Sequence, residues 1–183
     1  MTQASPQPSA SAVPSVLSAP SASATCATPE IDAFTRPYWE AAGAGRLLVR
    51  RCRACARAHH YPREFCPYCW SDEVDWETAS GRAVLYTWSV VHRNDLPPFG
   101  ARTPYVAAVV DLAEGPRMAT EVVGWEEAGG GLRVGMPLKV AFRPAPDGPP
   151  IPVFRPTTGG AGWDAAPRPA PQSPAGLDVA GGA

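Results

Sequence analysis

Four cysteines arranged as two Cys-x-x-Cys pairs constrain this chain more than any other feature. The pairs are Cys52 with Cys55 and Cys66 with Cys69, and the sequence of 183 residues has one further cysteine, Cys26. Two residues between cysteines allow the backbone to turn so that both thiolates point to one position, and two such turns complete a tetrahedron around Zn²⁺. Four thiolates leave no coordination position open for water or substrate, so the pattern predicts a structural zinc site rather than a catalytic one.

Other interpretations of the four cysteines compete with zinc. A disulfide framework suits secreted proteins, but residues 1–29 lack the basic start and the continuous apolar core of an export signal. A redox site needs one pair rather than two, and no βαβ pattern surrounds either pair. Iron in a rubredoxin-like site uses the same ligands and stays open as an alternative. His59 and His60 lie between the pairs; either could replace a cysteine as a ligand, but we interpret them as a solvated loop.

Composition divides the chain into an ordered middle and two tails. Residues 1–30 are dominated by Ala, Ser and Pro, residues 157–183 are mostly Gly, Ala and Pro, and both segments are expected to be disordered. The middle suits one compact unit or a small domain with an appendage that a metal stabilises. We expect an N-terminal helix at 31–45, a zinc ribbon at 46–79 and a β-barrel at 80–156. No apolar stretch is long enough to span a membrane.

The middle segment begins with the patterns of one helix and a ribbon. Aromatic and small apolar residues recur at helical spacing in residues 31–44, and Pro37 suits the first helical turn. Residues 47–49 then lead as a strand into the first cysteine pair, and residues 74–76 leave the second. The ten residues between the pairs, 56–65, are enough for a narrow hairpin or a compact loop.

Beyond the ribbon the hydrophobic pattern changes to a period of two, which is typical of half-buried strands. A long strand is expected at 82–93, with Val84, Tyr86, Trp88 and Val90 on one face. Four further strands are expected, at 105–112, at 117–123, around 138–143 and at 151–154. The connection at 124–136 is expected to contain a short helical turn at 125–128.

Five strands with a longer connection after the third match a small Greek-key barrel of the OB type. Periodicity predicts strands but not their pairing, so an unrelated five-stranded barrel or an open sheet stays an alternative. The expected fold class is therefore mainly β, with one helix, a zinc ribbon and an OB-like barrel.

Charge argues against a dedicated nucleic-acid-binding protein. The formal net charge is −1, and residues 31–156 contain 15 basic and 14 acidic residues, a net charge of +1. Binding to phosphates requires a strongly basic surface. The charge is nevertheless uneven, because six arginines precede the first acidic residue of the ribbon at Glu64. They are Arg46, Arg50, Arg51, Arg53, Arg57 and Arg63. They indicate either a solvated surface or an anion-binding patch.

Several stretches together resemble a known family. They are YWEAAGAGRLLVRRCRAC, YPREFCPYC, GRAVLYTWSVVH, PYVAAVVDLAEGPRM and IPVFRP, in this order over 31–156. The order and spacing resemble the rubredoxin-like zinc-ribbon and OB-fold proteins that associate with acyl-CoA metabolism. One departure is Ala56, where this family often has glycine.

The resemblance implies a function. Family members are typically non-catalytic partners of thiolase-fold enzymes, including condensing thiolases, acyltransferases and aldolases. The resemblance implies that Cys52, Cys55, Cys66 and Cys69 bind zinc, and that the chain stabilises such a partner and helps to position acyl-CoA. It further implies a cytoplasmic accessory subunit in a hetero-oligomer. No recognisable nucleophile or metal-hydrolase motif surrounds the histidines, which agrees with a non-catalytic role.

Two hypotheses concern binding surfaces. Arginine forks can grip the phosphates of CoA, so Arg50, Arg51, Arg53 and Arg63 are candidates for receiving its nucleotide end. The Pro-rich segment 95–104 carries the apolar residues Leu96 and Phe99, and it is a candidate for docking on the partner enzyme.

Two other functions stay open from the sequence. OB barrels often bind single-stranded nucleic acid by aromatic stacking, and Tyr86, Trp88, Tyr105 and Phe142 could supply the rings. Alternating aromatic residues are more often core residues, and the weak net charge disfavours this function. An independent small enzyme is the other alternative. The acyl group, the reaction of the partner and the stoichiometry do not follow from the sequence.

Overall fold

The computed structural model describes residues 29–125, 131–146 and 148–157. The regular elements are α1 (Arg36–Gly43), β1 (Leu48–Cys52), β2 (Ala58–His59), β3 (Val74–Thr78), β4 (Arg82–Val91), β5 (Tyr105–Leu112), β6 (Arg117–Val122), β7 (Pro137–Ala145) and β8 (Gly148–Pro156), with a short 3₁₀ turn at Gly100–Arg102. The fold is mainly β, as predicted. Both expected tails, apart from their innermost residues, and most of the helical turn expected at 125–128 lie outside the described residues. None of the described helices has the length and apolar character needed to cross a membrane.

Helix α1 begins later than its sequence pattern indicates. Residues 33–35 form a turn, and the helix starts at Arg36 with proline in its first turn. The Asp32 carboxylate accepts hydrogen bonds from the Thr35 amide at 2.6 Å and the Thr35 hydroxyl at 2.8 Å. These bonds hold the preceding turn in a non-helical conformation. The helix buries Tyr38 and Trp39, whose rings meet edge to face with centroids 4.9 Å apart.

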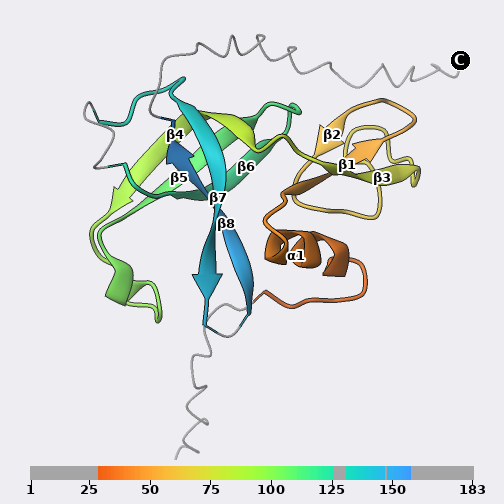
Figure 1. The fold of residues 1–183 in the computed structure, drawn as a ribbon. Coiled ribbons are helices and arrows are strands. Elements are labelled where there is room, and N and C mark those ends of the chain that lie inside the picture. The colour runs from red at the N-terminus through yellow and green to blue at the C-terminus, as the bar shows by residue number, and fades with distance from the viewer. Residues whose placement is uncertain (1–28, 126–130, 147, 158–183) are drawn as a thin grey trace, which may run out of the picture.

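The ribbon is a three-stranded antiparallel sheet in the order β2-β1-β3. Strand β1 is central and pairs Arg50 with His59 on one side and with Trp76 on the other. The ten residues between the cysteine pairs do not form a hairpin of their own, because β2 is the one strand within them and it pairs with β1 across the first cysteine turn. Figure 1 shows this small sheet beside the larger barrel, with α1 below the sheet.

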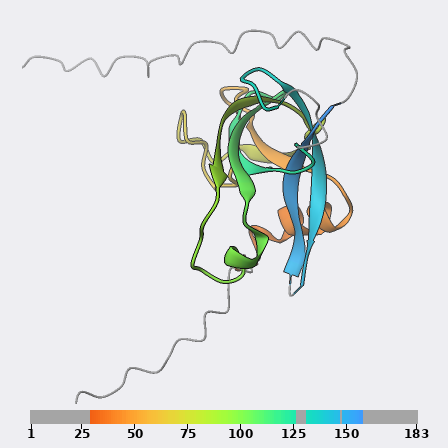
Figure 2. The ribbon, with the colours of Figure 1, turned by 90° about the vertical axis from the view of Figure 1, so that its left-hand side faces the viewer.

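Five strands close into a barrel in the order β4-β5-β6-β8-β7, and β4 also pairs with β7. All neighbouring strands are antiparallel except β6 and β8, which are parallel. This arrangement is that of the predicted OB-type barrel. Strand β5 shows the expected alternation over its full length, with every second residue from Val106 to Leu112 buried. Figure 2 shows the barrel from its side, with the loop before β5 extending from one end.

The prediction that Val84, Tyr86, Trp88 and Val90 all share one face of β4 is wrong. The pairing of β4 with β5 shifts register between Leu85 and Thr87, so an extra residue enters β4 at this point. Before this bulge Ala83 and Leu85 face the core; after it Trp88 and Val90 pack against the core. The bulge moves the following side chains to the opposite face, so Trp88 and Val90 reach the core side. Val84 and Tyr86 alternate with the buried Ala83 and Leu85 and lie on the outer face, where Tyr86 is exposed.

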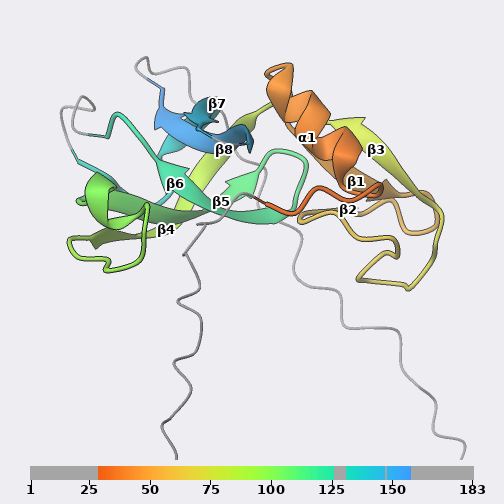
Figure 3. The same cartoon turned by 90° about the horizontal axis from the view of Figure 1, so that it is seen from below.

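One continuous hydrophobic core joins the helix, the near end of the ribbon and the barrel. Its buried members include Trp39 of α1, Leu48 of β1, and Leu85 and Phe154 of the barrel. Helix α1 packs against both β8 and β1. Seen from below in Figure 3, α1 lies between the ribbon strands and the β7–β8 side of the barrel. The far end of the ribbon has only a small buried cluster of its own, made of Cys52, Cys66 and Val74.

Candidate functional site

The four cysteines of the ribbon converge on one point. Their sulfur atoms all lie within 4.8 Å of one another. The Sγ atoms of Cys52 and Cys69 are 3.6 Å apart, as are those of Cys55 and Cys66. A tetrahedron with Zn–S bonds of about 2.3 Å has edges of about 3.8 Å, whereas a disulfide needs about 2.05 Å. The geometry is therefore that of a four-thiolate metal site, as the sequence predicted. Iron, the alternative from the sequence, would bind through the same four sulfur atoms.

Two tight turns place the cysteines, and each places a non-glycine residue in the left-handed region. Ala56 follows the first pair with φ 57° and Trp70 follows the second with φ 63°. The Cys52 amide donates to the Arg57 carbonyl at 3.0 Å, and the Cys66 amide donates to the Ser71 carbonyl at 2.9 Å. Ala56 thus adopts the conformation that glycine favours, and the turn keeps its shape with a strained residue.

The thiols ionise unequally without a cation. Burial alone would raise the pKa of Cys52, but hydrogen bonds from the amides of Cys55 and Ala54 and from the Cys69 thiol lower it to about 7. Burial, together with the neighbouring sulfurs, raises the pKa of Cys55 to about 12. Four adjacent thiolates repel one another, so a divalent cation is needed to hold all four deprotonated. The donor set therefore fits a metal ion better than four free thiols.

Neither histidine of the ribbon belongs to this site, and the interpretation of both as a solvated loop is wrong. His59 is 3% exposed. The His60 ring lies 3.1 Å from the Tyr38 hydroxyl, in hydrogen-bonding distance. Burial and the neighbouring His59 lower the pKa of His60 to about 4. His59 is therefore buried within the ribbon, and His60 lies against Tyr38 of α1.

Arg50 has a structural role in the ribbon. Its side chain is buried, and its guanidinium lies 4.7 Å from the ring centroid of Trp76 and 5.4 Å from that of Phe34. It also donates to the Val74 carbonyl at 2.8 Å. Burial lowers the pKa of Arg50, and the nearby Asp75 partly offsets this effect. The guanidinium therefore joins β1 to β3 and to the residues before α1.

The other three candidate arginines differ in their surroundings. Arg51 forms a short two-bond ion pair with Glu77, and Arg53 pairs with Asp75 at 2.6 Å. These pairs balance the charge of a shallow cleft of about 450 Å³ beside the metal site. Arg63 is exposed, and no hydrogen bond or ion pair joins it to another residue that the structure describes. The predicted role of these arginines in CoA binding stays a prediction, and Arg63 is the member whose charge is free.

The two candidate docking residues lie on different surfaces. Leu96 is 66% exposed at the tip of its loop. Phe99 turns back toward the barrel, where its ring centroid is 6.4 Å from that of Tyr105 and where it lines a cleft. Leu96 therefore suits contact with another protein, whereas Phe99 belongs to the wall of that cleft.

Sequence reasoning missed this cleft, which lies between the helix and ribbon on one side and the barrel on the other. It has a volume of about 340 Å³. Its charged residues, Arg102, Glu121 and Arg143, come from three separate elements and lie up to 41 positions apart in the sequence. No spacing pattern could connect them before the barrel was folded.

Comparisons with known proteins identify the family. Residues 39–75 match the family model described as ChsH2, rubredoxin-like zinc ribbon domain, and residues 76–143 match that described as ChsH2, C-terminal OB-fold domain. The chain is 33% identical over 98 residues to a DUF35 domain-containing scaffold protein of Methanocaldococcus jannaschii, covering 53% of this chain and 67% of that protein. The chain belongs to the DUF35 family. The resemblance noted from the sequence is thereby confirmed.

A solved structure and two further relatives are also similar to this chain. A chain of the structure titled Ltp2-ChsH2(DUF35) aldolase matches with a TM-score of 0.60 and 36% identity, covering 70% of this chain and 98% of that one. A probable enoyl-CoA hydratase alpha subunit of Thermomonospora curvata is 38% identical over 130 residues, 70% of this chain. The benzoylsuccinyl-CoA thiolase subunit BbsA of Geobacter metallireducens is 32% identical over 74 residues, 40% of this chain.

The two named relatives are much longer than the region that matches this chain. This DUF35 chain spans 39% of the length of the hydratase subunit and 48% of the thiolase subunit. The activities in the names of those two proteins are therefore stated only of those proteins.

Proposed function

We propose that this DUF35 chain is a non-catalytic, zinc-binding accessory subunit that binds a thiolase-like enzyme and helps to stabilise it or to position its acyl-CoA substrate. The observation that carries the proposal is the match over 98% of a chain in an Ltp2-ChsH2(DUF35) aldolase structure. The names of a scaffold protein and a thiolase subunit among the relatives agree with it. The partner is a thiolase, acyltransferase or aldolase, and the complex acts in the cytoplasm.

Zinc is the proposed occupant of the four-cysteine site. Cys52, Cys55, Cys66 and Cys69 would hold it, and the ion would supply positive charge that keeps the four thiolates together. The small buried cluster at this end of the ribbon cannot stabilise the turns by itself. The metal therefore maintains the shape of the ribbon, and no catalytic step is assigned to it.

Two surfaces have distinct proposed roles. Leu96 docks on the partner enzyme, because a large apolar side chain that is 66% exposed gains free energy when another protein covers it. Arg63 receives a phosphate of CoA, since its guanidinium has no ion pair among the described residues.

Single-stranded nucleic-acid binding has weaker support. Stacking requires aromatic rings with open faces. The guanidinium of Arg117 lies over the Tyr86 ring at 3.4 Å and also pairs with Asp111. Trp88 and Phe142 pack against the core, and Tyr105 accepts a hydrogen bond from Asn94. The four rings proposed from the sequence therefore do not form one open stacking surface.

Isolation of the native complex tests the proposed function. The full chain carrying an affinity tag is expressed in its own host, and co-purifying proteins are identified by mass. A thiolase-fold enzyme in a fixed ratio, whose acyl-CoA activity or stability falls when the chain is removed, is expected. Turnover of acyl-CoA by the purified chain alone would contradict a non-catalytic role.

A matched pair of variants tests the docking surface. Leu96→Asp should weaken the complex at least tenfold, because it introduces a charge into an apolar contact. Val134→Asp is the control, since Val134 is 69% exposed and lies outside the loop. Equal retention of the partner by both variants in gel filtration would remove Leu96 from the interface.

A further inference from the structure

The cleft between the ribbon side and the barrel has an apolar body and one charged end. Aromatic rings from both sides line it, among them Tyr38, Tyr61, Phe99 and Tyr105, and Met118 and Ile151 add aliphatic surface. Its volume of about 340 Å³ lies at the lower end of the range of small-molecule sites. The cleft could therefore enclose a compact ligand rather than a macromolecule.

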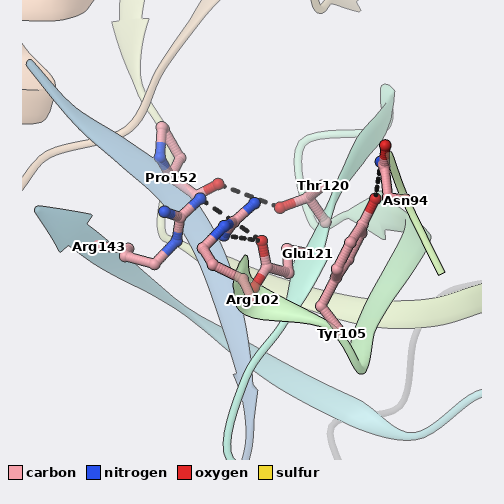
Figure 4. Close-up of polar contacts among 7 residues, drawn as sticks. All are labelled: Asn94, Arg102, Tyr105, Thr120, Glu121, Arg143 and Pro152. Atoms are coloured by element: carbon pink, nitrogen blue, oxygen red, sulfur yellow. Dashed lines mark hydrogen bonds and ion pairs between the residues drawn. The ribbon is translucent and has the colours of Figure 1, made fainter. Parts of the chain in front are cut away.

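The charged end consists of two arginines that share one carboxylate oxygen. Oε2 of Glu121 accepts a bond from Nη1 of Arg102 at 2.9 Å and one from Nη2 of Arg143 at 3.4 Å. In Figure 4 the two guanidiniums reach this carboxylate from different elements, the turn before β5 and strand β7. Arg102 is also positioned by Phe99 and Tyr105, whose ring centroids lie 5.4 and 5.5 Å from its guanidinium carbon.

The charge of this group is not balanced. Two guanidiniums and one carboxylate leave a net charge of +1, and no other residue lining the cleft carries a charge near neutral pH, because the pKa of His60 is lowered to about 4. Nη2 of Arg102 and Nη1 of Arg143 have no hydrogen bond to another residue in the described part of the chain. The side chains of Arg102, Glu121 and Arg143 are 26%, 17% and 31% exposed, so the group remains accessible to a ligand.

The surrounding backbone and side chains hold the group in place. The Thr120 hydroxyl donates to the Pro152 carbonyl at 3.1 Å and joins β6 to β8. The side-chain amide of Asn94 donates to the Tyr105 hydroxyl at 2.9 Å and anchors the loop that carries Arg102. Both bonds are drawn in Figure 4. The group therefore belongs to the fixed frame of the barrel, a property that binding sites need.

We propose that the cleft is a binding site for a small amphipathic monocarboxylate, an aromatic or short aliphatic acid. Its carboxylate would neutralise the single excess charge and accept bonds from Arg102 and Arg143, a geometry that guanidinium forks favour. Its apolar part would lie against the aromatic wall. A phosphate dianion is the poorer match, because it would leave an excess negative charge beside Glu121. This site is separate from the metal site, and its occupancy does not depend on the proposed partner enzyme.

Binding of benzoate to the metal-loaded full chain tests the proposal by isothermal titration and by NMR shift perturbation. Benzoate and phenylacetate should bind saturably, and acetate should bind at least tenfold more weakly because it lacks the apolar part. Inorganic phosphate and CoA form the second arm. Tighter binding of either one than of benzoate at this cleft would overturn the assignment to a carboxylate, and so would the absence of saturable benzoate binding.

Four variants make the test specific. Arg143→Gln should weaken benzoate binding at least tenfold, whereas Arg155→Gln, an exposed arginine on β8 outside the cleft, should leave it unchanged. Glu121→Gln raises the net charge of the group to +2 and should tighten the binding of anions. Ala107→Leu narrows the cleft without changing charge and should weaken benzoate binding even if a charge variant folds poorly. Unchanged affinity in both Arg143→Gln and Ala107→Leu, with thermal unfolding showing folded protein, would overturn the site.

Discussion

The guanidinium of Arg50 lies 4.7 Å from the ring centroid of Trp76, its direct partner on the neighbouring strand of the ribbon. This contact and the burial of its side chain distinguish Arg50 from the exposed Arg63 of the same stretch. A charge that is stacked between rings and bonded to a backbone carbonyl contributes to folding, whereas a solvated guanidinium contributes to binding.

Arg50→Ala should lower the free energy of unfolding by about 2–4 kcal/mol, because it removes a cation–π contact and a hydrogen bond from a charged donor. Arg63→Ala should change stability by less than about 0.5 kcal/mol. In the assembled complex, Arg63→Ala should instead weaken the binding of CoA esters. Chemical denaturation and ligand titration measure the two effects. A large loss of stability in Arg63→Ala would contradict this division.

Removal of the metal should affect one end of the ribbon first. The two cysteine turns, residues 52–57 and 66–74, depend on the four thiolates and on a cluster of three buried residues, whereas Val49 of β1 and Ala58 of β2 belong to the main core. After treatment with a chelator, hydrogen exchange should show loss of protection in these two turns and retained protection in α1 and the barrel. Elemental analysis should give one zinc per chain. Cys26→Ser should keep the metal, and Cys66→Ser should lose it.

Ala56→Gly should stabilise the protein by about 0.5–1 kcal/mol. Ala56 has φ 57°, which costs an L-residue about 1–2 kcal/mol, and glycine regains only part of this because its unfolded chain is more flexible. Ala54→Gly is the matched control in the same turn, and it should destabilise because Ala54 is not among the residues with positive φ. Thermal unfolding of the metal-loaded proteins distinguishes the two signs.

Gly81→Ala should destabilise the junction between ribbon and barrel by about 2 kcal/mol or more. Gly81 has φ 73°, and a Cβ at this position would lie 2.4 Å from Cγ1 of Val140. Gly115→Ala provides the comparison, since Gly115 also has positive φ but no atom within 4 Å of the added Cβ. The double change Gly81→Ala with Val140→Ala should recover part of the loss. Equal effects of the two single changes would show that the contact with Val140 is unimportant.

Stability should fall as the pH drops from about 6.5 to 4. The pKa of His60 is lowered from 6.5 to about 4 in the folded protein, so the unfolded chain binds more protons in this range. The contribution is fully present above pH 6.5, and about 3 kcal/mol is lost on reaching pH 4. His60→Gln should flatten this part of the curve and His92→Gln, an exposed residue, should not. Parallel curves for wild type and His60→Gln would refute the assignment.

The sequence predicted those parts of the fold that follow from local patterns. The alternation in β5 and the two cysteine pairs each lie within a short stretch, so the strand and the metal site could be predicted directly. The bulge at Tyr86 could not, because it depends on pairing between β4 and β5 rather than on the residues of β4 alone. The contact of His60 with Tyr38 could not either, since it depends on how the ribbon packs against α1.

The metal site and the cleft also differ in whether the sequence alone could predict them. Cys52 and Cys69 are 17 positions apart, and their motif has a known spacing. Arg102 and Arg143 meet at Glu121 only after the barrel has closed. Arg50 belongs to an arginine-rich stretch by sequence, but its burial between Phe34 and Trp76 depends on the turn that precedes α1.

The shared core has a consequence for the evolution and engineering of this chain. The family models meet between residues 75 and 76, yet Trp39 and Leu48 on one side of that point share a core with Leu85 and Phe154 on the other. If the helix and ribbon were exchanged with those of a relative, their core residues would pack against barrel residues from a different protein. Recombinants should therefore tolerate exchange at the cysteine turns better than exchange at the apparent module boundary.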